Sequence, residues 1–281
     1  MLRINGSSDI KKPIPEHLQA KIPEHLQAKD FRFKAMFSIG SAKAIKANKL
    51  GYLNAINYMA PHDSGSVGAK KRFSLCSHAS AGCIALCLGK YSGQAAIVAD
   101  LEHGTNPTRE SRIRKAQYFM FERQLYMREF VAHVILLQRK ALKLYMTLVV
   151  RPNGSTDIAY ENIKIRAYHN KTLPQLFPSL QLVDYTKNLR RLLDSNRPSN
   201  YHLTFSLSEN NRAEAIVALK YGYNVAVVFG GALPETFLGH KVINGDAHDL
   251  RHLDDSPRIV GLTPKGNKAK LDVSGFVVRD Y

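Results

Sequence analysis

From residue 147 onward the chain alternates between short apolar, β-branched runs and segments with helical character. The runs at 147–151, 180–184, 202–205 and 224–229 are typical of buried strands, and each ends in a polar turn. The clearest helical segment between them is 210–221. Strands that alternate with helices at this spacing predict βαβ units. We therefore expect an α/β fold built on a parallel sheet, either open or closed into a partial (β/α) barrel.

The N-terminal half is expected to be more helical. Residues 106–145 open with the helix-start sequence Asn106-Pro-Thr-Arg-Glu and then carry apolar residues at helical spacing, which predicts one long helix or two. A shorter helix should follow the glycine turn at Gly40. The polar side of the long segment is positively charged, and we expect most of its cations to be solvated: Arg112, Arg114, Lys115, Arg123 and Arg128.

The organisation of the chain changes near residue 31. Residues 1–31 are polar and contain a tandem copy, Ile14–Lys21 repeated at Ile22–Lys29. Two copies are too few for a solenoid, so we interpret this part as a peripheral segment. Residues 32–281 are expected to form a single α/β domain. Its last strands should be 258–262 and an edge strand at 275–278.

All three cysteines of the chain lie within one short segment, with the spacing C-x6-C-x3-C. Cys76, Cys83 and Cys87 can converge on one centre if the loop folds back, and thiolates are the preferred ligands of zinc and of iron–sulfur clusters. If a helix starts at Cys83, Cys87 shares its face. The segment therefore predicts a metal or cluster site. The alternative is three small buried apolar side chains.

Three thiolates leave one coordination position open, and two chemistries follow from this. His78 is a candidate fourth ligand, which would give a closed Cys3His zinc site of the structural kind. A [4Fe–4S] cluster held by the three cysteines would instead leave one iron free for an exchangeable ligand. The sequence leaves both alternatives open.

Polar side chains follow the predicted strands, at the points where the strands end. In a parallel sheet these ends meet at one rim, which is where ligands bind. We expect Lys187 to hold a negative group and Glu209 an amine or a hydroxyl. The alternative is that the set consists of ordinary turn and cap residues. The candidate rim residues, which we expect beside the cysteine loop, are Asn153, Asp157, Tyr185, Lys187, Ser206, Ser208 and Glu209.

A further acidic and histidine-rich segment lies near the C-terminus. Asp246, His248 and Asp249 have spacings that suit a divalent ion or an acid–base pair, which suggests a phosphate-handling hydrolase. The alternative is a turn in which the aspartates cap backbone amides.

Composition restricts the partners and the compartment. The chain has 40 Lys and Arg against 23 Asp and Glu, a net charge of +17, which favours an anionic substrate or nucleic acid. Three closely spaced cysteines argue against a secreted disulfide framework. No apolar run is long enough for a membrane span or a signal peptide. We expect a cytoplasmic protein with no membrane contact.

Eight short motifs in a fixed order carry a family resemblance: CSHASAGCIALC, RPNGSTDI, DYTKN, YHLTFSLSEN, GYNVAVVF, INGDAHDLRHLD, VGLTPKG and SGFVV. This set resembles the phage gene product 88 domain family over about residues 35–278. The resemblance implies a phage or mobile-element origin, and hence the cytoplasm of a host cell.

The cysteine arrangement is in turn similar to that of radical S-adenosylmethionine enzymes, although their common spacing is C-x3-C-x2-C. Those enzymes bind a [4Fe–4S] cluster through three cysteines at the top of a partial (β/α) barrel, and the free iron holds S-adenosylmethionine. The similarity implies an iron–sulfur protein with Cys76, Cys83 and Cys87 as ligands, acting on an anionic substrate. The alternative is a zinc-stabilised nucleic-acid-binding protein without catalysis.

Overall fold

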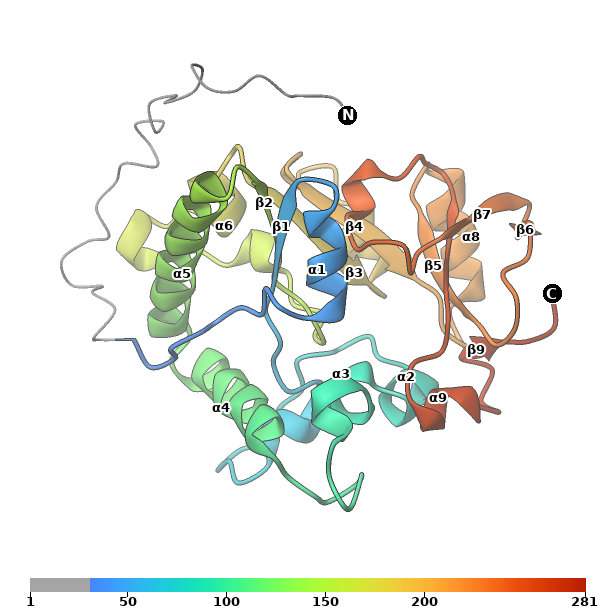
Figure 1. The fold of residues 1–281 in the computed structure, drawn as a ribbon, viewed down its shortest axis with the longest axis horizontal. Coiled ribbons are helices and arrows are strands. Elements are labelled where there is room, and N and C mark those ends of the chain that lie inside the picture. Colours follow the sequence, from blue (N-terminus) through green and yellow to red (C-terminus); the bar gives the residue numbers. More distant parts are fainter. Residues whose placement is uncertain (1–30) are drawn as a thin grey trace, which may run out of the picture.

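The centre of the fold is a mostly parallel sheet. The computed structural model describes residues 31–281 (Figure 1), so the tandem copy at 14–29 lies outside the described residues. Six strands pair in parallel and in chain order: β1 (Tyr52–Ile56), β2 (Thr147–Arg151), β3 (Gln181–Thr186), β4 (Tyr201–Ser206), β5 (Val225–Phe229) and β8 (Ile259–Leu262). The predicted α/β fold with a parallel sheet is confirmed.

The order of the strands is that of a barrel that has been opened out. The sheet path runs from β1 at one edge through β8 and the parallel β7 (His240–Asn244) to β6 (Thr236–Phe237) at the other. β6 pairs antiparallel with β7 as a short hairpin. Because β1 to β5 pair in parallel, their carboxyl ends all lie along one edge of the sheet.

Helices connect and cover the strands. The longer ones are α1 (Ala42–Asn48), α4 (Pro107–Phe121), α5 (Arg123–Lys143) and α8 (Arg212–Lys220). The short ones are α2 (Ala81–Ala85), α3 (Leu88–Tyr91), α6 (Leu173–Leu176), α7 (Leu189–Leu192) and α9 (Asn267–Lys270). Five further turns are 3-10 helices, at His62–Ser66, Gly93–Ala96, Tyr160–Asn162, Arg166–Tyr168 and Arg251–Leu253. Among the described residues no helix, not even the 21-residue α5, is apolar enough to cross a bilayer.

The predicted helical segment at 106–145 is two helices. Asn106 begins α4 as expected, because its side chain accepts a hydrogen bond from the Arg109 amide at 2.9 Å and Pro107 occupies the first turn. Glu122 then has φ −129° and ψ 42°, which is not helical, and α5 starts at the next residue. The chain therefore turns between the two helices, which lie one above the other in Figure 1.

The two faces of the sheet are covered differently. Successive side chains of a strand point to opposite faces, so neighbours such as Val149 and Val150 belong to different cores. Val150 packs in the main hydrophobic core, which also contains Phe130 of α5. Val149 belongs to a small cluster with Ala47 of α1 and Leu250. α1, which Figure 1 shows in front of the strands, therefore covers the second face together with the segment before β8.

The structure contains strands that the sequence did not predict, and one predicted strand lies at a different place in the sheet. The strand β1 and the β6–β7 hairpin were not expected from the sequence. The predicted edge strand at 275–278 forms as β9 (Val277–Val278), but it does not extend an edge of the sheet. It pairs in parallel with Val228 and Phe229 of β5, beyond the residues of β5 that pair with β4. The C-terminal segment therefore lies at the carboxyl edge of the sheet.

A buried ion pair fastens the loop after β2 to α7. Arg191 donates from Nε and Nη2 to the two carboxylate oxygens of Glu161, at 2.6 and 2.9 Å, and from Nη1 to Asp157 at 2.8 Å. The side chains of Arg191 and Glu161 are almost fully buried. A two-point guanidinium–carboxylate contact fixes orientation as well as distance, so the loop is held in one position at the carboxyl edge.

Asp184 of β3 continues this network. It accepts hydrogen bonds from the Asn153 amide at 2.9 Å, from Asn153 Nδ2 at 2.7 Å and from the Tyr201 hydroxyl. Burial nevertheless raises the pKa of Asp184 to about 6, because desolvation of the carboxylate outweighs the opposing effects of Arg191 and Tyr201.

This pKa predicts a pH dependence of stability. The folded protein binds the Asp184 proton more tightly than the unfolded chain does, so the stabilisation is complete below about pH 4 and is lost as the pH rises through about 6. Asp184→Asn removes this titration. Between pH 4 and 7 the free energy of unfolding of the wild type should fall by about 2 kcal/mol relative to the variant. Urea unfolding at four pH values measures this, and a difference that does not change with pH would contradict it.

Candidate functional site

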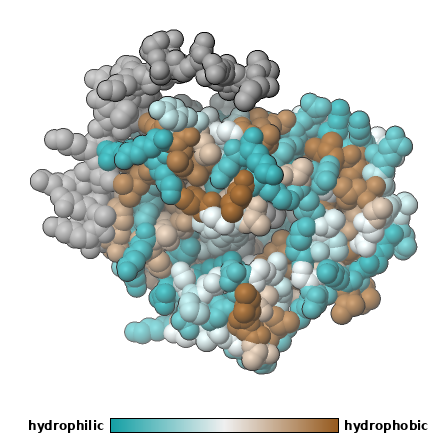
Figure 2. Space-filling view, in the orientation of Figure 1, coloured by the Kyte–Doolittle hydropathy of each residue, from teal (hydrophilic) through white to brown (hydrophobic). Residues whose placement is uncertain are grey.

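A cavity of about 210 Å³ opens at the carboxyl edge of the sheet. One wall consists of inward-facing residues from the ends of successive strands: Arg151, Tyr185, Ser206, Val228 and Leu262. The cysteine segment and the C-terminal segment form the other walls. Figure 2 shows a hollow in the middle of this face, between the sheet and the layer of short helices. The cavity is several times the ~30 Å³ that one water molecule occupies in the liquid, so it has room for a group larger than a single ion.

All three cysteines line this cavity, and none of them forms a disulfide. Cys76 lies in the loop after β1, Cys83 lies in α2, and Cys87 immediately precedes α3. The expectation that a single helix carries Cys83 and Cys87 on one face is wrong. α2 ends at Ala85, and Cys87 has a non-helical backbone with φ −54° and ψ 118°. The two thiols reach the cavity from two separate helical turns.

Glu209, which follows β4, fixes the position of α2. Its Oε1 accepts a hydrogen bond from the Gly82 amide at 2.8 Å, and its Oε2 accepts one from the Ser80 hydroxyl at 2.7 Å. Ser80 Oγ in turn accepts from the Cys83 amide at 3.2 Å and caps the helix. The contact is close, since a Cβ on Gly82 would lie 2.7 Å from Ser274 Oγ and 2.9 Å from Glu209 Oε2. Glu209 therefore holds the cysteine segment and does not line the cavity.

Two thiols of this cavity, those of Cys76 and Cys87, have raised pKa values. Burial raises the pKa of Cys76 to about 12, although the His62 amide donates a hydrogen bond to its sulfur at 3.4 Å. Burial also raises the pKa of Cys87 to about 11. The charges of the neighbouring thiolates add to both shifts, those of Cys87 and Cys83 on Cys76 and that of Cys83 on Cys87. A bound cation reverses this balance, because it stabilises thiolates and releases their protons.

The structure does not bring the cysteines together into a metal centre. In the part of the chain from residue 31 on, no three His, Cys, Asp or Glu side chains are arranged so that they hold an ion. His78 is exposed, with Nδ1 2.9 Å from Ser77 Oγ, and it does not line the cavity. The roles of Cys76, Cys83 and Cys87 as ligands stay a prediction.

Four of the expected rim residues line the cavity beside the thiols: Asp157, Tyr185, Lys187 and Ser206. Lys187 donates from Nζ to Ser206 Oγ at 2.7 Å, and both residues line the cavity. Tyr185 also lines it, and its buried hydroxyl has no hydrogen-bond partner among the described residues. Burial raises the pKa of Tyr185 to about 12, so the hydroxyl remains a donor at neutral pH. The Arg151 guanidinium lies 4.7 Å from the centre of its ring.

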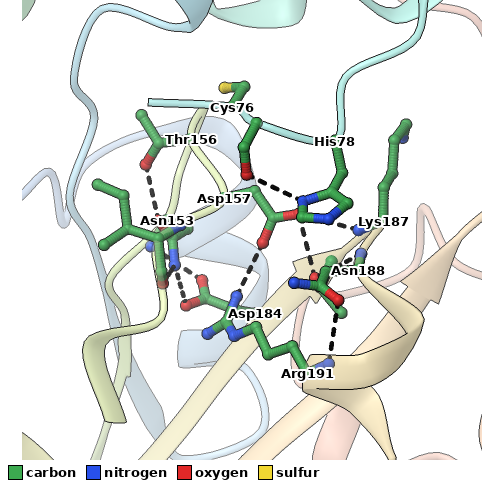
Figure 3. Close-up of polar contacts among 12 residues, drawn as sticks. Cys76, His78, Asn153, Thr156, Asp157, Asp184, Lys187, Asn188 and Arg191 are labelled. Carbon is green, nitrogen blue, oxygen red and sulfur yellow. Dashed lines mark hydrogen bonds and ion pairs between the residues drawn. The ribbon is translucent and has the colours of Figure 1, made fainter. Parts of the chain in front are cut away.

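Asp157 links the rim to the network beneath it. Its Oδ2 accepts from the Lys187 amide at 2.9 Å and from the Thr186 hydroxyl at 3.1 Å. Figure 3 shows Asp157 between the segment that carries Cys76 and the end of β3 that carries Lys187. Its carboxylate also raises the pKa of Cys76, which is a sign of how near the two groups are. Asp157 thus lines the cavity, and its carboxylate also holds the backbone at Lys187 in place.

Two further expected rim residues act locally in turns. Asn153 Oδ1 accepts from the Thr156 hydroxyl at 2.8 Å and from the Ile158 amide at 2.9 Å. The Ser208 amide donates to Asn211 Oδ1 at 2.7 Å. Neither residue lines the cavity. These contacts are those of the alternative interpretation, in which such residues cap backbone groups.

The candidate rim residues do not include three residues that line the cavity, although the turn with Lys265 was expected to approach a phosphate. Arg151 is the last residue of a predicted strand and belongs to the rim by the same rule as its neighbours. Lys265 lies in the basic turn after β8, and His62 lies in the loop after β1, the strand that was not expected. The position of a residue at a strand end identifies Arg151 and Lys265, but no local pattern identifies His62.

The acidic and histidine-rich segment is engaged with the protein itself. Asp246 lines the cavity. Its Oδ2 accepts hydrogen bonds from the Thr263 amide at 2.9 Å and from the Thr263 hydroxyl at 2.7 Å. Burial would raise the pKa of Asp246, but these bonds and Lys265 hold it below the ordinary value. His248 Nδ1 accepts from the Leu250 amide at 3.2 Å, and Asp249 pairs with Arg151 at 3.3 Å.

Fold and site together define a class: an α/β protein with parallel strands in barrel order and a thiol-lined cavity at their carboxyl ends. The family model described as gene product 88 matches residues 34–280. The chain therefore belongs to the gene product 88 family. Searches of curated proteins and of solved structures found no match.

The Glu209 contact can be tested directly. Glu209→Ala removes both acceptors at the start of α2, so the free energy of unfolding should fall by about 2–3 kcal/mol. The Cys83 thiol should react faster with a disulfide reagent, because α2 is no longer held. Urea unfolding and labelling kinetics measure the two effects. Glu214→Ala, an exposed site in α8, is the control and should change stability by less than about 0.5 kcal/mol. Equal behaviour of the two variants would contradict the assigned role.

Proposed function

We propose that the protein is an iron–sulfur protein in which Cys76, Cys83 and Cys87 bind a [4Fe–4S] cluster at the carboxyl edge of the sheet. The observation that carries the proposal is that all three thiols line one cavity with Tyr185 and Lys187. Three thiols at the ends of parallel strands that pair in chain order resemble the cysteine arrangement of radical S-adenosylmethionine enzymes. We therefore place the protein among proteins of that architecture.

The electrostatics of the thiols supports a bound cation. Neighbouring thiolate charges raise the pKa values of Cys76 and Cys87, so a metal centre removes a repulsion as well as adding bonds. The His62 amide already donates to the Cys76 sulfur, and the amides of Gly89 and Lys90 favour the Cys87 thiolate. Hydrogen bonds of this kind tune the potential of iron–sulfur clusters.

The size of the cavity supports a cluster over a single zinc ion. A zinc ion draws all its sulfur ligands to about 2.3 Å, whereas each cysteine of a cluster binds a different iron. The thiols here surround a cavity of about 210 Å³, and His78, the candidate fourth zinc ligand, is exposed outside it.

The open side of the cavity suits S-adenosylmethionine or another anionic group. When bound, a cluster with one free iron supplies an electron and a coordination position. The Lys187 ammonium would hold a carboxylate beside the cluster. The Ser206 hydroxyl, which accepts a hydrogen bond from this ammonium, would keep Lys187 in place. Tyr185 lines the same cavity, and its buried hydroxyl has no hydrogen-bond partner among the described residues. We place this chemistry in the reducing cytoplasm of a host cell, where thiolates persist.

Anaerobic reconstitution tests the proposal. Full-length protein treated with iron and sulfide should become brown and hold about four iron and four sulfide per chain. Cys76→Ala, Cys83→Ala and Cys87→Ala should each lose nearly all of the bound iron, because the three ligands act as a unit. Ser77→Ala, a neighbouring exposed site, is the control and should bind iron normally. A colourless protein that holds one zinc would refute the proposal in favour of the zinc alternative.

A further inference from the structure

A second hollow lies beside the thiol cavity. It is lined by α1, by the segment that carries α3 and by one side of α4. The two hollows share the wall residues Leu88, Arg151, Gly154, Asp246 and Lys265, so they are adjacent. We call the second hollow the α4 groove.

Cations of α4 line this groove. Arg112 and Lys115 stand three residues apart on one side of the helix. The sequence predicts a solvated face for the cations of this segment, and Arg114 is indeed exposed. The prediction is wrong for Lys115, of which only 7% is exposed, because α4 packs this side against the rest of the protein.

Neither of these two charges has a carboxylate partner among residues 31–281. Lys115 donates from Nζ to the Met36 carbonyl at 3.2 Å, and Arg112 donates from Nη1 to the Gly89 carbonyl at 2.5 Å. In the part of the chain that the structure describes, neither forms a salt bridge. The Arg112 guanidinium lies 4.9 Å from the centre of the Tyr58 ring. Burying a charge is costly unless a group of opposite charge compensates it.

The effect of this burial is visible on Lys115. Desolvation, and to a smaller extent the nearby Arg112 charge, lower the pKa of its ammonium to about 8. One of its three N–H donors is used by Met36, which leaves two for a ligand. An anion in the groove would satisfy these donors and compensate both charges.

The remaining wall of the groove also suits an anion. Small hydroxyl and amide side chains line it: Ser38, Ser41, Ser92, Gln94, Thr108 and Ser111. Its two carboxylates already have cationic partners, Asp246 with Lys265 at 3.1 Å and Asp249 with Arg151 at 3.3 Å. The unbalanced charge of the groove is therefore positive.

We propose that the α4 groove binds an oxyanion group of the substrate, a phosphate or a carboxylate, through Lys115 and Arg112. Anion binding itself follows from the groove alone. That the anion belongs to a substrate directed at the thiols rests on the proposed function, and the position of Arg112 supports it, since its charge also acts on Cys87.

Thermal unfolding of the full-length protein tests the proposal. Sodium phosphate and sodium succinate are added separately at pH 7, with chloride keeping the ionic strength constant. The Tm of the wild type should rise with one or both anions as the site fills. The anion that acts at the lower concentration identifies phosphate or carboxylate as the preferred group.

Lys115→Met is the decisive variant. It removes a buried uncompensated charge at similar volume, so its Tm in chloride should equal or exceed that of the wild type. Its response to the anion should weaken at least tenfold in concentration. Arg114→Met removes the same charge from the exposed side of α4 and should respond like the wild type. Arg112→Gln is a second variant, with the same expected loss, if Lys115→Met does not fold.

Two results would overturn the inference: no rise in the wild-type Tm with either anion, or an undiminished response in the groove variant that folds. Iron content of the same preparations separates this inference from the proposed function. Protein that binds iron but no anion refutes the groove alone. Protein that binds the anion but no iron refutes the cluster and leaves the groove in place.

Discussion

The parallel pairing of six strands in chain order is the constraint on which the site depends. It brings the carboxyl ends of β2, β3, β4, β5 and β8 to one edge, although the residues there are more than a hundred positions apart. The loop after β1 carries the cysteines to the same edge. Glu209 then ties this loop to the end of β4 through two hydrogen bonds. Sheet topology sets which residues meet, and a few buried polar contacts set their positions.

A second physical theme is the grouping of charge at this edge. The thiols lie beside Lys187, Arg151 and Lys265, and Arg112 is close enough to Cys87 to favour its thiolate. A thiolate-bound cluster and an anionic ligand would both be stabilised in such surroundings. The two carboxylates that line the same cavity are paired with cations, Asp157 with Arg191 and Asp246 with Lys265.

How much of this can be predicted from sequence depends on whether the property is local. β2 coincides with its predicted range, since a β-branched run between turns is typical of a buried strand. β1 escaped prediction because Asn54 interrupts its apolar run, although that side chain is fully buried. The burial of Lys115 and the contacts of Glu209 are set by tertiary packing, so no pattern along the chain reveals them. Strand-end position nevertheless identifies Tyr185, Lys187 and Ser206 as residues of one cavity.

The most direct test of the account is the position of the metal. Crystals of anaerobically reconstituted protein, measured on both sides of the iron absorption edge, give an anomalous difference map. The account predicts one strong iron peak in the cavity among Cys76, Cys83 and Cys87, facing Lys187. An iron peak elsewhere, a zinc peak at the cysteines, or no peak in protein that carries iron in solution would contradict it.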